Sequence, residues 1–296
     1  MNPARVHRTF LVLDPAENSY ARSRFALLPI PYDATVSFQV GTRRGPEAII
    51  AASEHLETYD EETGLEPVDA GVCVLPMLEQ HVDGPAAMTA AIHAAAAPVV
   101  ADGKFLIGLG GEHGVTPGLV RATAEKHEKL SVLQIDAHLD LRDSYQGSQW
   151  SHATAMRRCL DHVQTVVPVG IRNICREELD FMKARDIQPF MADRCVQSDD
   201  WIPAAVAALS DNVYVTIDVD GFDPAYAPGT GTPVPGGLDW YRVTRLLRAV
   251  AKERRIVGAD IVEVMPVAGS AVTEFLAARL AYKIMAYTLA KEEGLL

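Results

Sequence analysis

Cysteine is scarce in this sequence, and long apolar runs are missing. Only four of the 296 residues are cysteines, at Cys73, Cys159, Cys175 and Cys195, and none of them belongs to a C-x-x-C pair. A disulfide framework is therefore disfavoured as the basis of the fold, and we expect buried thiols. No segment comes near the roughly 20 apolar residues of a membrane-spanning helix, so we expect no membrane partner.

An excess of basic residues and a leader sequence are also missing. The chain carries 27 lysines and arginines against 39 aspartates and glutamates, a net charge of −12. An acidic surface disfavours nucleic acid and anionic membranes as partners. The N-terminal segment contains only a short apolar run, broken by Asp14 and Pro15, instead of the apolar region of a signal peptide. We therefore expect a cytoplasmic protein.

What the sequence does have is a regular alternation of short apolar runs and helical patterns. Most of the runs lack the polar alternation of half-exposed strands, as is typical of parallel strands buried on both faces. This rhythm predicts an α/β fold of three layers, α/β/α, around a central, mostly parallel sheet. Linkers and repeats are absent, so we expect one domain over residues 1–296. The predicted strands are residues 25–28, 72–75, 105–109, 132–135, 163–169, 213–217 and 256–262, and the predicted helices are residues 45–60, 84–100, 116–129, 176–186, 239–253 and 271–293.

Acidic and imidazole side chains follow four of the predicted strands. Ligands bind at the carboxyl ends of the strands in open parallel sheets, so we expect these side chains to gather at one edge. Taken alone, each has an ordinary explanation, such as a solvated or capping histidine or a solvated strand end. The residues concerned are Glu112, His113, Asp136, His138, Asp140, Asp218, Asp220 and Glu263.

Four carboxylates in one pocket need a counter-charge. At a spacing of about 4 Å and an effective dielectric near 20, each close pair repels by about 4 kcal/mol. Two divalent cations would balance four carboxylates, and two neutral imidazoles would complete the ligands. Carboxylate-rich ligation with some imidazole favours Mn²⁺, while zinc, cobalt, nickel and iron stay open. A two-metal site that holds a bridging hydroxide is typical of hydrolases.

These motifs resemble those of the ureohydrolase family, which includes arginase, agmatinase, guanidinobutyrase and formiminoglutamase. The motifs are GGEHG at 110–114, DAHLD at 136–140, TIDVDGFDP at 216–224 and DIVEVMP at 260–266. PIPYDATVSFQVGTRRGPEAI near the start and PGTGTPVPGGL in the long loop 221–238 are similar to agmatinases, so the likeness covers nearly the whole chain. The resemblance implies hydrolysis of a guanidinium group to urea and an amine. It also implies a homo-oligomer, a trimer or a hexamer.

The resemblance implies that all six metal ligands are present. Two of them would bridge the ions, and two more would complete each site. The bridging residues would be Asp136 and Asp218, the first site would be completed by His113 and Asp140, and the second by His138 and Asp220.

Three residues acquire catalytic roles from the same resemblance. Asp140 would hold the bridging hydroxide by a hydrogen bond. Glu263 would pair with the substrate guanidinium in bidentate fashion. His152 would protonate the leaving amine, because histidine titrates in the right range. Without a catalytic role, Glu263 would be an ordinary acid at the end of a strand. His152 would then be a residue at the start of a helix that Ser151 caps.

The motifs depart from the family at three positions. Glu112 replaces a commoner aspartate, Gly114 a frequent serine and Met265 the usual asparagine. None of these changes removes a proposed metal ligand, but each is placed to alter the groups around the ligands or the substrate pocket.

The substrate is predicted from what surrounds these motifs. Arginases bind the amino and carboxylate groups of arginine with residues that this sequence lacks. Arg142, Asn173 and Cys175 stand at those positions, which disfavours arginine as the substrate. We therefore expect agmatine, hydrolysed to putrescine and urea, with its distal ammonium near Asp143 or near Glu177 or Glu178.

Two alternatives stay open. Arg142 could bind the carboxylate of 4-guanidinobutanoate or a related guanidino acid, although a surface pair with Asp143 is the favoured reading. The chain could also be a metal-binding scaffold without catalysis, against which the complete ligand set, Glu263 and His152 argue.

Overall fold

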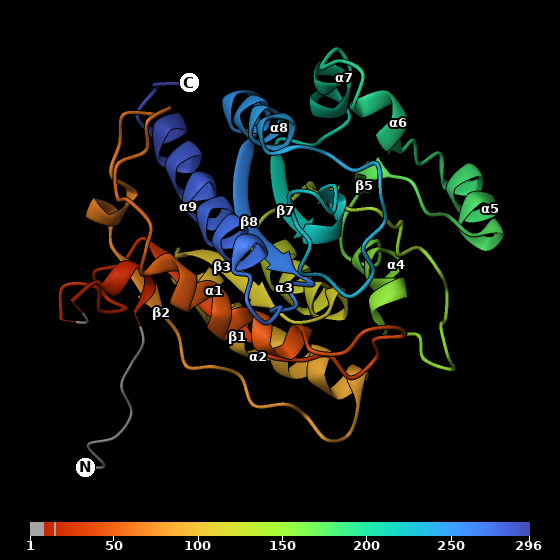
Figure 1. Ribbon diagram of the computed structural model, residues 1–296, viewed down its shortest axis with the longest axis horizontal. Helices are drawn as coiled ribbons and strands as arrows, with labels where there is room; N and C mark the ends of the chain where they lie inside the picture. Colours follow the sequence, from red (N-terminus) through yellow and green to blue (C-terminus); the bar gives the residue numbers. More distant parts are fainter. Residues whose placement is uncertain (1–8, 15) are drawn as a thin grey trace.

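The computed structural model describes residues 9–14 and 16–296, so Pro15, which interrupts the N-terminal apolar run, lies outside the described residues. Within them, eight parallel strands form a single sheet in the order β2-β1-β3-β8-β7-β4-β5-β6 (Figure 1). This sheet, covered by helices, confirms the predicted α/β fold. The strands are β1 (Phe25–Ile30), β2 (Val72–Val74), β3 (Phe105–Gly110), β4 (Leu130–Ile135), β5 (Thr165–Ile171), β6 (Phe190–Met191), β7 (Asn212–Asp218) and β8 (Arg255–Val262).

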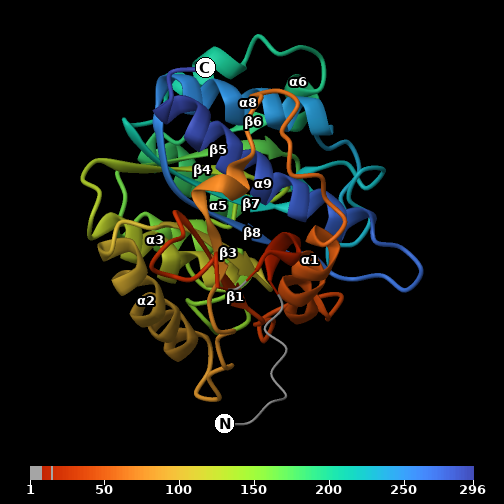
Figure 2. The same cartoon turned by 90° about the vertical axis from the view of Figure 1, so that its left-hand side faces the viewer.

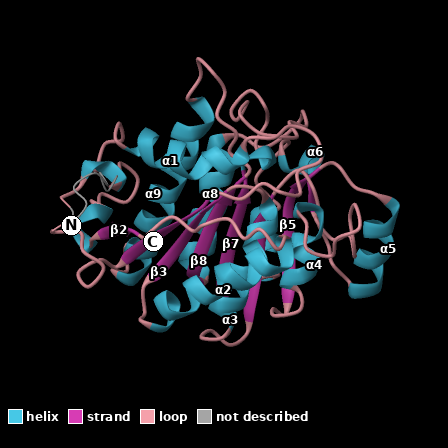
Figure 3. Cartoon of the chain, turned by 90° about the horizontal axis from the view of Figure 1, so that it is seen from below, coloured by secondary structure: helices cyan, strands magenta, loops and turns pink. Residues whose placement is uncertain are grey.

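Helices cover both faces of the sheet. One face carries α1 (Gly45–Ser53), α7 (Ile202–Ala207), α8 (Trp240–Glu253) and α9 (Val272–Glu292). The other carries α2 (Pro85–Ala101), α3 (Thr116–Ala124), α4 (Ala155–Cys159) and α5 (Arg176–Arg185), and a short α6 (Ala192–Cys195) follows β6. Figure 3 shows the strands between these layers, and Figure 2 shows α1 beside α9. None of the helices in the described part of the chain is both long and apolar enough to cross a membrane.

The strands supply two cores because successive side chains point to opposite faces of a sheet. In β1, Phe25 and Leu27 pack into the core beneath α1 and α9, whereas Ala26 and Leu28 pack into the core beneath α2 and α3. Burial on both faces explains why the strands read as continuous apolar runs in the sequence.

Several element boundaries differ from the predicted ones. The strand predicted at 163–169 is β5 at Thr165–Ile171, two residues later. The helix predicted at 45–60 ends at Ser53, because the following turn buries Asp60 beside Lys283 of α9. The helix predicted at 116–129 ends at Ala124, and Lys129 takes a positive φ of 51° directly before β4. The short elements β6, α4, α6 and α7 were not predicted, since two to six residues carry little periodic signal.

Candidate metal centre and active site

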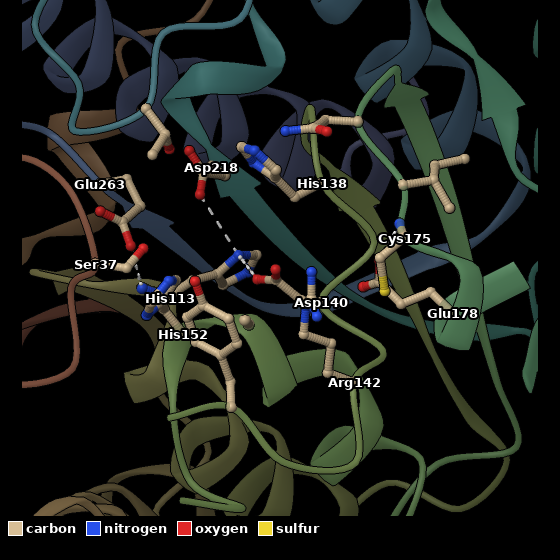
Figure 4. Close-up of a pocket in the computed structure, with 15 residues that line it drawn as sticks. Ser37, His113, His138, Asp140, Arg142, His152, Cys175, Glu178, Asp218 and Glu263 are labelled. Carbon is tan, nitrogen blue, oxygen red and sulfur yellow. Dashed lines mark hydrogen bonds and ion pairs between the residues drawn. The ribbon is translucent and has the colours of Figure 1, made fainter. Parts of the chain in front are cut away.

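Four neighbouring strands bring the predicted site residues together. β3, β8, β7 and β4 are adjacent in the sheet, and the candidate residues follow the carboxyl ends of these strands. His113 opens a 3-10 turn, η4 (His113–Val115), Asp218 ends β7, and Asp220 lies in η6 (Val219–Gly221). Figure 4 shows His113, His138, Asp140 and Asp218 gathered in one pocket.

Two overlapping groups of three residues could each hold a metal ion. The first comprises His113, Asp136 and Asp140, and the second comprises Asp136, His138 and Asp220. His113 Nδ1 lies 3.1 Å from Asp136 Oδ2 and 3.0 Å from Asp140 Oδ2, and His138 Nδ1 lies 3.1 Å from Asp220 Oδ2. Asp136 is therefore shared by both groups.

Asp218, the second predicted bridging residue, approaches the first group. Its Oδ2 lies 3.5 Å from His113 Nδ1, and its Oδ1 accepts a 2.8 Å hydrogen bond from the Asp220 backbone N–H. The structure thus brings all six predicted ligand residues to one place. The assignment of each residue to an ion stays a prediction.

The surroundings of His113 determine which of its ring nitrogens faces the acids. Tyr214 donates to Asp260 Oδ2 at 2.8 Å, and Thr216 donates to Asp260 Oδ1 at 2.6 Å. Since the Thr216 proton is used on Asp260, its oxygen can only accept from His113 Nε2, which lies 2.9 Å away. Nε2 then carries a proton, which leaves Nδ1 as the ring nitrogen that faces the carboxylates and would give its lone pair to a cation.

This cluster fits a pair of divalent cations. Nδ1 of His113 is buried and has no hydrogen-bond partner of suitable geometry among the described residues, although three carboxylates surround it. Burial raises the pKa of Asp218 well above its ordinary value, and Asp220 and Asp136 raise it further. Burial together with Asp136 raises the pKa of Asp140 to about 7. Oxygen-rich ligation with two imidazoles suits Mn²⁺ and related ions, which would relieve this repulsion.

Glu263 and Asp140 both occupy strained backbone positions. Their φ angles are 63° and 53°, in the left-handed region that residues other than glycine rarely adopt. Glu263 is held there by two bonds, since its N–H donates to Gly111 O at 2.7 Å and its Oε1 accepts from His113 N at 2.8 Å. Strain of this kind is typical of functional sites. The carboxylate of Glu263 is thereby placed in the pocket beside His113 (Figure 4).

His152 lines the same pocket from η5 (His152–Thr154). Its ring lies nearly perpendicular to that of Tyr145, with centroids 5.6 Å apart, and its Nδ1 lies 3.3 Å from Thr35 Oγ1. Burial lowers the pKa of His152 to about 4, with smaller contributions from His138 and His113. Ser151 stands at the N-cap position of η5, where its backbone N–H donates to Thr154 Oγ1 at 2.9 Å.

The comparison with known proteins agrees with this geometry. The sequence matches the Arginase family model over residues 23–287. The chain belongs to the arginase family. It is therefore a ureohydrolase of a family of binuclear metal enzymes, and its Asp/His cluster suits such a centre.

Individual members of the arginase family resemble the chain along most of its length. An N(1)-aminopropylagmatine ureohydrolase of Synechocystis sp. is 43% identical over 279 residues, which cover 92% of this chain and 91% of that protein. An agmatinase of Halalkalibacterium halodurans is 36% identical over 269 residues, 85% of this chain and 87% of that protein. The crystal structure of the agmatine ureohydrolase of Thermoplasma volcanium is 32% identical, covers 97% of this chain and 96% of that one, and has a TM-score of 0.87.

The pocket of this arginase-family chain is a cavity of about 240 Å³. Beyond His152 and Asp140, its wall contains Arg142, Tyr145 and Glu178. The expected surface pair of Arg142 with Asp143 is wrong. Arg142 instead lies over the ring of Tyr145 at 5.0 Å, and Asp143 pairs with two other arginines, Arg157 and Arg158.

Of the acids predicted to meet a distal ammonium, Glu178 is the one that lines the cavity. Its Oε1 accepts from Leu141 N at 3.1 Å and its Oε2 from Cys175 N at 3.0 Å. Glu177 is exposed and accepts from the backbone N–H of Asp143.

The long loop 221–238 supplies another wall. Thr232 lines the cavity and donates to Asp220 Oδ2 at 3.1 Å, while Arg172 donates to Asp220 O and Val234 O. The long loop, whose sequence is similar to that of agmatinases, is thus bonded to the candidate metal centre.

Sequence reasoning did not single out Thr35, Tyr145, Thr216 or Asp260. Asp260, Thr216 and Thr35 all lie within the family-like motifs, and a lone aspartate in the apolar run 256–262 is the signal that marks Asp260. Thr35 and Tyr145 lie in loops, where no periodic pattern marks them.

Proposed function

We propose that this chain hydrolyses a guanidino-polyamine to urea and the free polyamine, with N(1)-aminopropylagmatine as the first candidate substrate and agmatine as the second. The 43% identity to an N(1)-aminopropylagmatine ureohydrolase carries the first choice. The products would be spermidine from N(1)-aminopropylagmatine and putrescine from agmatine. Agmatine, the substrate expected from the sequence, is supported by the 36% identity to an agmatinase.

The proposed metal-binding residues are His113, Asp136, His138, Asp140, Asp218 and Asp220, with Mn²⁺ as the proposed ion. When bound, two such cations supply an activated water for hydrolysis. The protein groups turn Nδ1 of His113 and the shared carboxylate of Asp136 toward this position. Asp140 would orient the attacking water by accepting a hydrogen bond from it.

Glu263 and His152 act on the substrate in this proposal. A carboxylate accepts two parallel N–H bonds from a guanidinium group, so Glu263 would hold the guanidinium carbon in place. The attacking water loses a proton, which His152 would take up and then pass to the departing nitrogen as the C–N bond to the polyamine breaks, and urea would remain. The wall around Glu178 would receive the ammonium groups of the polyamine chain.

The guanidino acid alternative has one supporting observation. Arg142 lies in the cavity wall, where it could meet the carboxylate of 4-guanidinobutanoate. A cytoplasmic homo-oligomer of three or six chains is proposed along with the activity, as the resemblance to the family implies.

Urea release tests the proposal. Purified protein loaded with Mn²⁺ is offered N(1)-aminopropylagmatine, agmatine, 4-guanidinobutanoate and arginine, and kcat/KM is measured for each. The highest value is expected for N(1)-aminopropylagmatine. Preference for agmatine would move the assignment to the second candidate, preference for 4-guanidinobutanoate would refute the polyamine proposal, and no urea from any compound would refute the whole function. Parallel loading with zinc, cobalt, nickel or iron tests the choice of Mn²⁺.

A further inference from the structure

Glu112, Thr35 and His152 form a hydrogen-bonded chain. The proposed reaction gives no role to its first two members. Glu112 is completely buried directly before His113, and both of its carboxylate oxygens face Thr35. The Thr35 backbone N–H donates to Oε2 at 2.7 Å, and the Thr35 hydroxyl donates to Oε1 at 2.6 Å. The same hydroxyl oxygen lies 3.0 Å from the backbone N and 3.3 Å from the Nδ1 of His152.

The bonding capacity of the Thr35 hydroxyl determines the state of His152. A hydroxyl has one proton and two lone pairs. When Glu112 is ionised, the hydroxyl proton goes to it, because a carboxylate only accepts, and one lone pair of the hydroxyl accepts the backbone N–H of His152. The second lone pair can therefore only accept a proton from His152 Nδ1. The ring is then held with Nδ1 protonated and with Nε2 free for exchange with the substrate.

Gly114 makes room for this arrangement. A Cβ atom added there would lie 2.8 Å from Glu112 Oε1 and 3.2 Å from the backbone N of His152. The two positions at which the motif departs from the family, Glu112 and Gly114, are thus coupled. Glutamate is longer than the commoner aspartate, and it fills the space that a side chain at position 114 would need.

We propose that Glu112 and Thr35 are positioning residues that orient His152 and keep its Nε2 free to take up a proton from the attacking water and pass it to the leaving amine. This inference rests on the proposed function, because the proton has a recipient only if a guanidino substrate is cleaved. It assigns a positioning role to the segment PYDATVSF, which places Thr35 between Glu112 and His152.

Kinetics of Thr35→Val, with Thr35→Ser as the matched control, test the proposal. Valine keeps the shape of threonine and removes the hydroxyl, whereas serine keeps the hydroxyl. With the full-length, Mn²⁺-loaded protein and the substrate that it cleaves fastest, Thr35→Val is expected to lower kcat about tenfold or more, a part of the 10²–10⁴ that acid–base catalysis contributes. KM and metal content should stay near those of the parent, and Thr35→Ser should restore most of kcat.

A double-mutant cycle separates positioning from mere structural support. In the His152→Ala background, Thr35→Val should cause no additional loss, because the group that it orients is gone. An unchanged kcat in Thr35→Val, a loss that multiplies with His152→Ala, or release of metal would each overturn the inference. If Thr35→Val does not fold, Glu112→Gln takes its place with the same expected results.

The state of the ring can also be read without turnover. In ¹⁵N-histidine protein loaded with diamagnetic Zn²⁺, the imidazole signals of His152, assigned by their loss in His152→Ala, should show a protonated Nδ1. A proton on Nε2 alone would overturn the inference even in an active enzyme. A parent protein that releases no urea would instead refute the proposed function, so the two failures are distinguishable.

Discussion

The backbone N–H of His113 donates a 2.8 Å hydrogen bond to Oε1 of Glu263, across 150 residues of sequence. The bond is possible because β3 and β8 are neighbours in the sheet, with Leu109 in register with Ile261. It joins a candidate metal ligand to the candidate guanidinium-binding carboxylate. Displacement of either residue would therefore move the other.

Glu263→Gln should retain metal and lose turnover. The amide oxygen of glutamine can still accept from His113 N, so the local structure is preserved, but the negative charge that pairs with a guanidinium is lost. We expect kcat/KM to fall about a hundredfold or more, since loss of one partner from a buried charge pair costs about 2–5 kcal/mol. Steady-state kinetics and elemental analysis check this, with exposed Glu177→Gln as control. Unchanged turnover would contradict the proposed role.

Asp136→Ala should lose metal, because Asp136 lies between both imidazoles and belongs to both ligand groups. Asp218→Ala should also lose metal if Asp218 is the second bridging residue. Elemental analysis after gel filtration measures the metal content per chain, and Asp180→Ala on the exposed side of α5 serves as control. Two ions per chain in either site variant would count against the assignment.

Asp260→Asn should weaken metal binding without touching a metal ligand. Asparagine can present an N–H to Thr216, so the hydroxyl proton of Thr216 would be free to turn toward His113 Nε2 and disturb its tautomer. Loss of such a supporting group typically costs 10–100-fold in metal affinity, and we expect about tenfold here. Competition with a fluorescent chelator measures the affinity, and an affinity equal to that of the parent would show that Asp260 does not act on His113.

Arg142→Ala distinguishes the two classes of substrate. If polyamines are the substrates, removal of this positive charge should leave kcat/KM for agmatine and N(1)-aminopropylagmatine unchanged or higher. If the substrate is a guanidino acid, kcat/KM for 4-guanidinobutanoate should fall about tenfold or more, as a charge-assisted bond is lost. Exposed Arg176→Ala is the control. A fall with polyamines alone would contradict both expectations, and the same kinetic assay would detect it.

Lys283→Met should destabilise the fold away from the site. Lys283 of α9 is buried with its Nζ 2.8 Å from Oδ2 of the completely buried Asp60. Removal of one partner leaves an uncompensated charge, which typically costs about 3–5 kcal/mol. Urea unfolding followed by circular dichroism measures the loss, with exposed Lys183→Met as control. A midpoint equal to that of the parent would contradict the prediction.

The same ion pair predicts a pH dependence of stability. Burial is the largest single effect and would lower the pKa of Lys283, but the interactions with Asp60 and Glu61 together outweigh it and raise the pKa above the ordinary value. The contribution is therefore fully present below about pH 10.4, the pKa of an unpaired lysine. It is lost as the pH rises through the higher pKa of the folded state. Parent and Lys283→Met should converge in stability above that pH.

Much of the site was accessible from the sequence because parallel strands impose a simple rule. Each apolar run buried on both faces ends at the same edge of the sheet, so the acids after 132–135 and 213–217 had to meet there. The rule locates the centre without any knowledge of strand order. It cannot supply the contacts of loops, whose paths depend on packing.

Arg142 illustrates what the rule misses. Its neighbour Asp143 offered an obvious partner in sequence, yet the side chains diverge, one to Tyr145 in the pocket and the other to α4. Helix ends were missed for a similar reason, since α1 ends at Ser53 and the following turn carries Asp60 to Lys283, far away along the chain.

The sequence by itself determined the α/β class and the candidate ligands, because burial and residue type act locally along each strand and its end. Only the tertiary structure decided that Thr216 and Asp260 govern the imidazole of His113, and that Thr35 connects Glu112 to His152. Such bonds join residues that are distant in sequence, and a difference of less than an ångström in their approach decides which atom donates and which accepts.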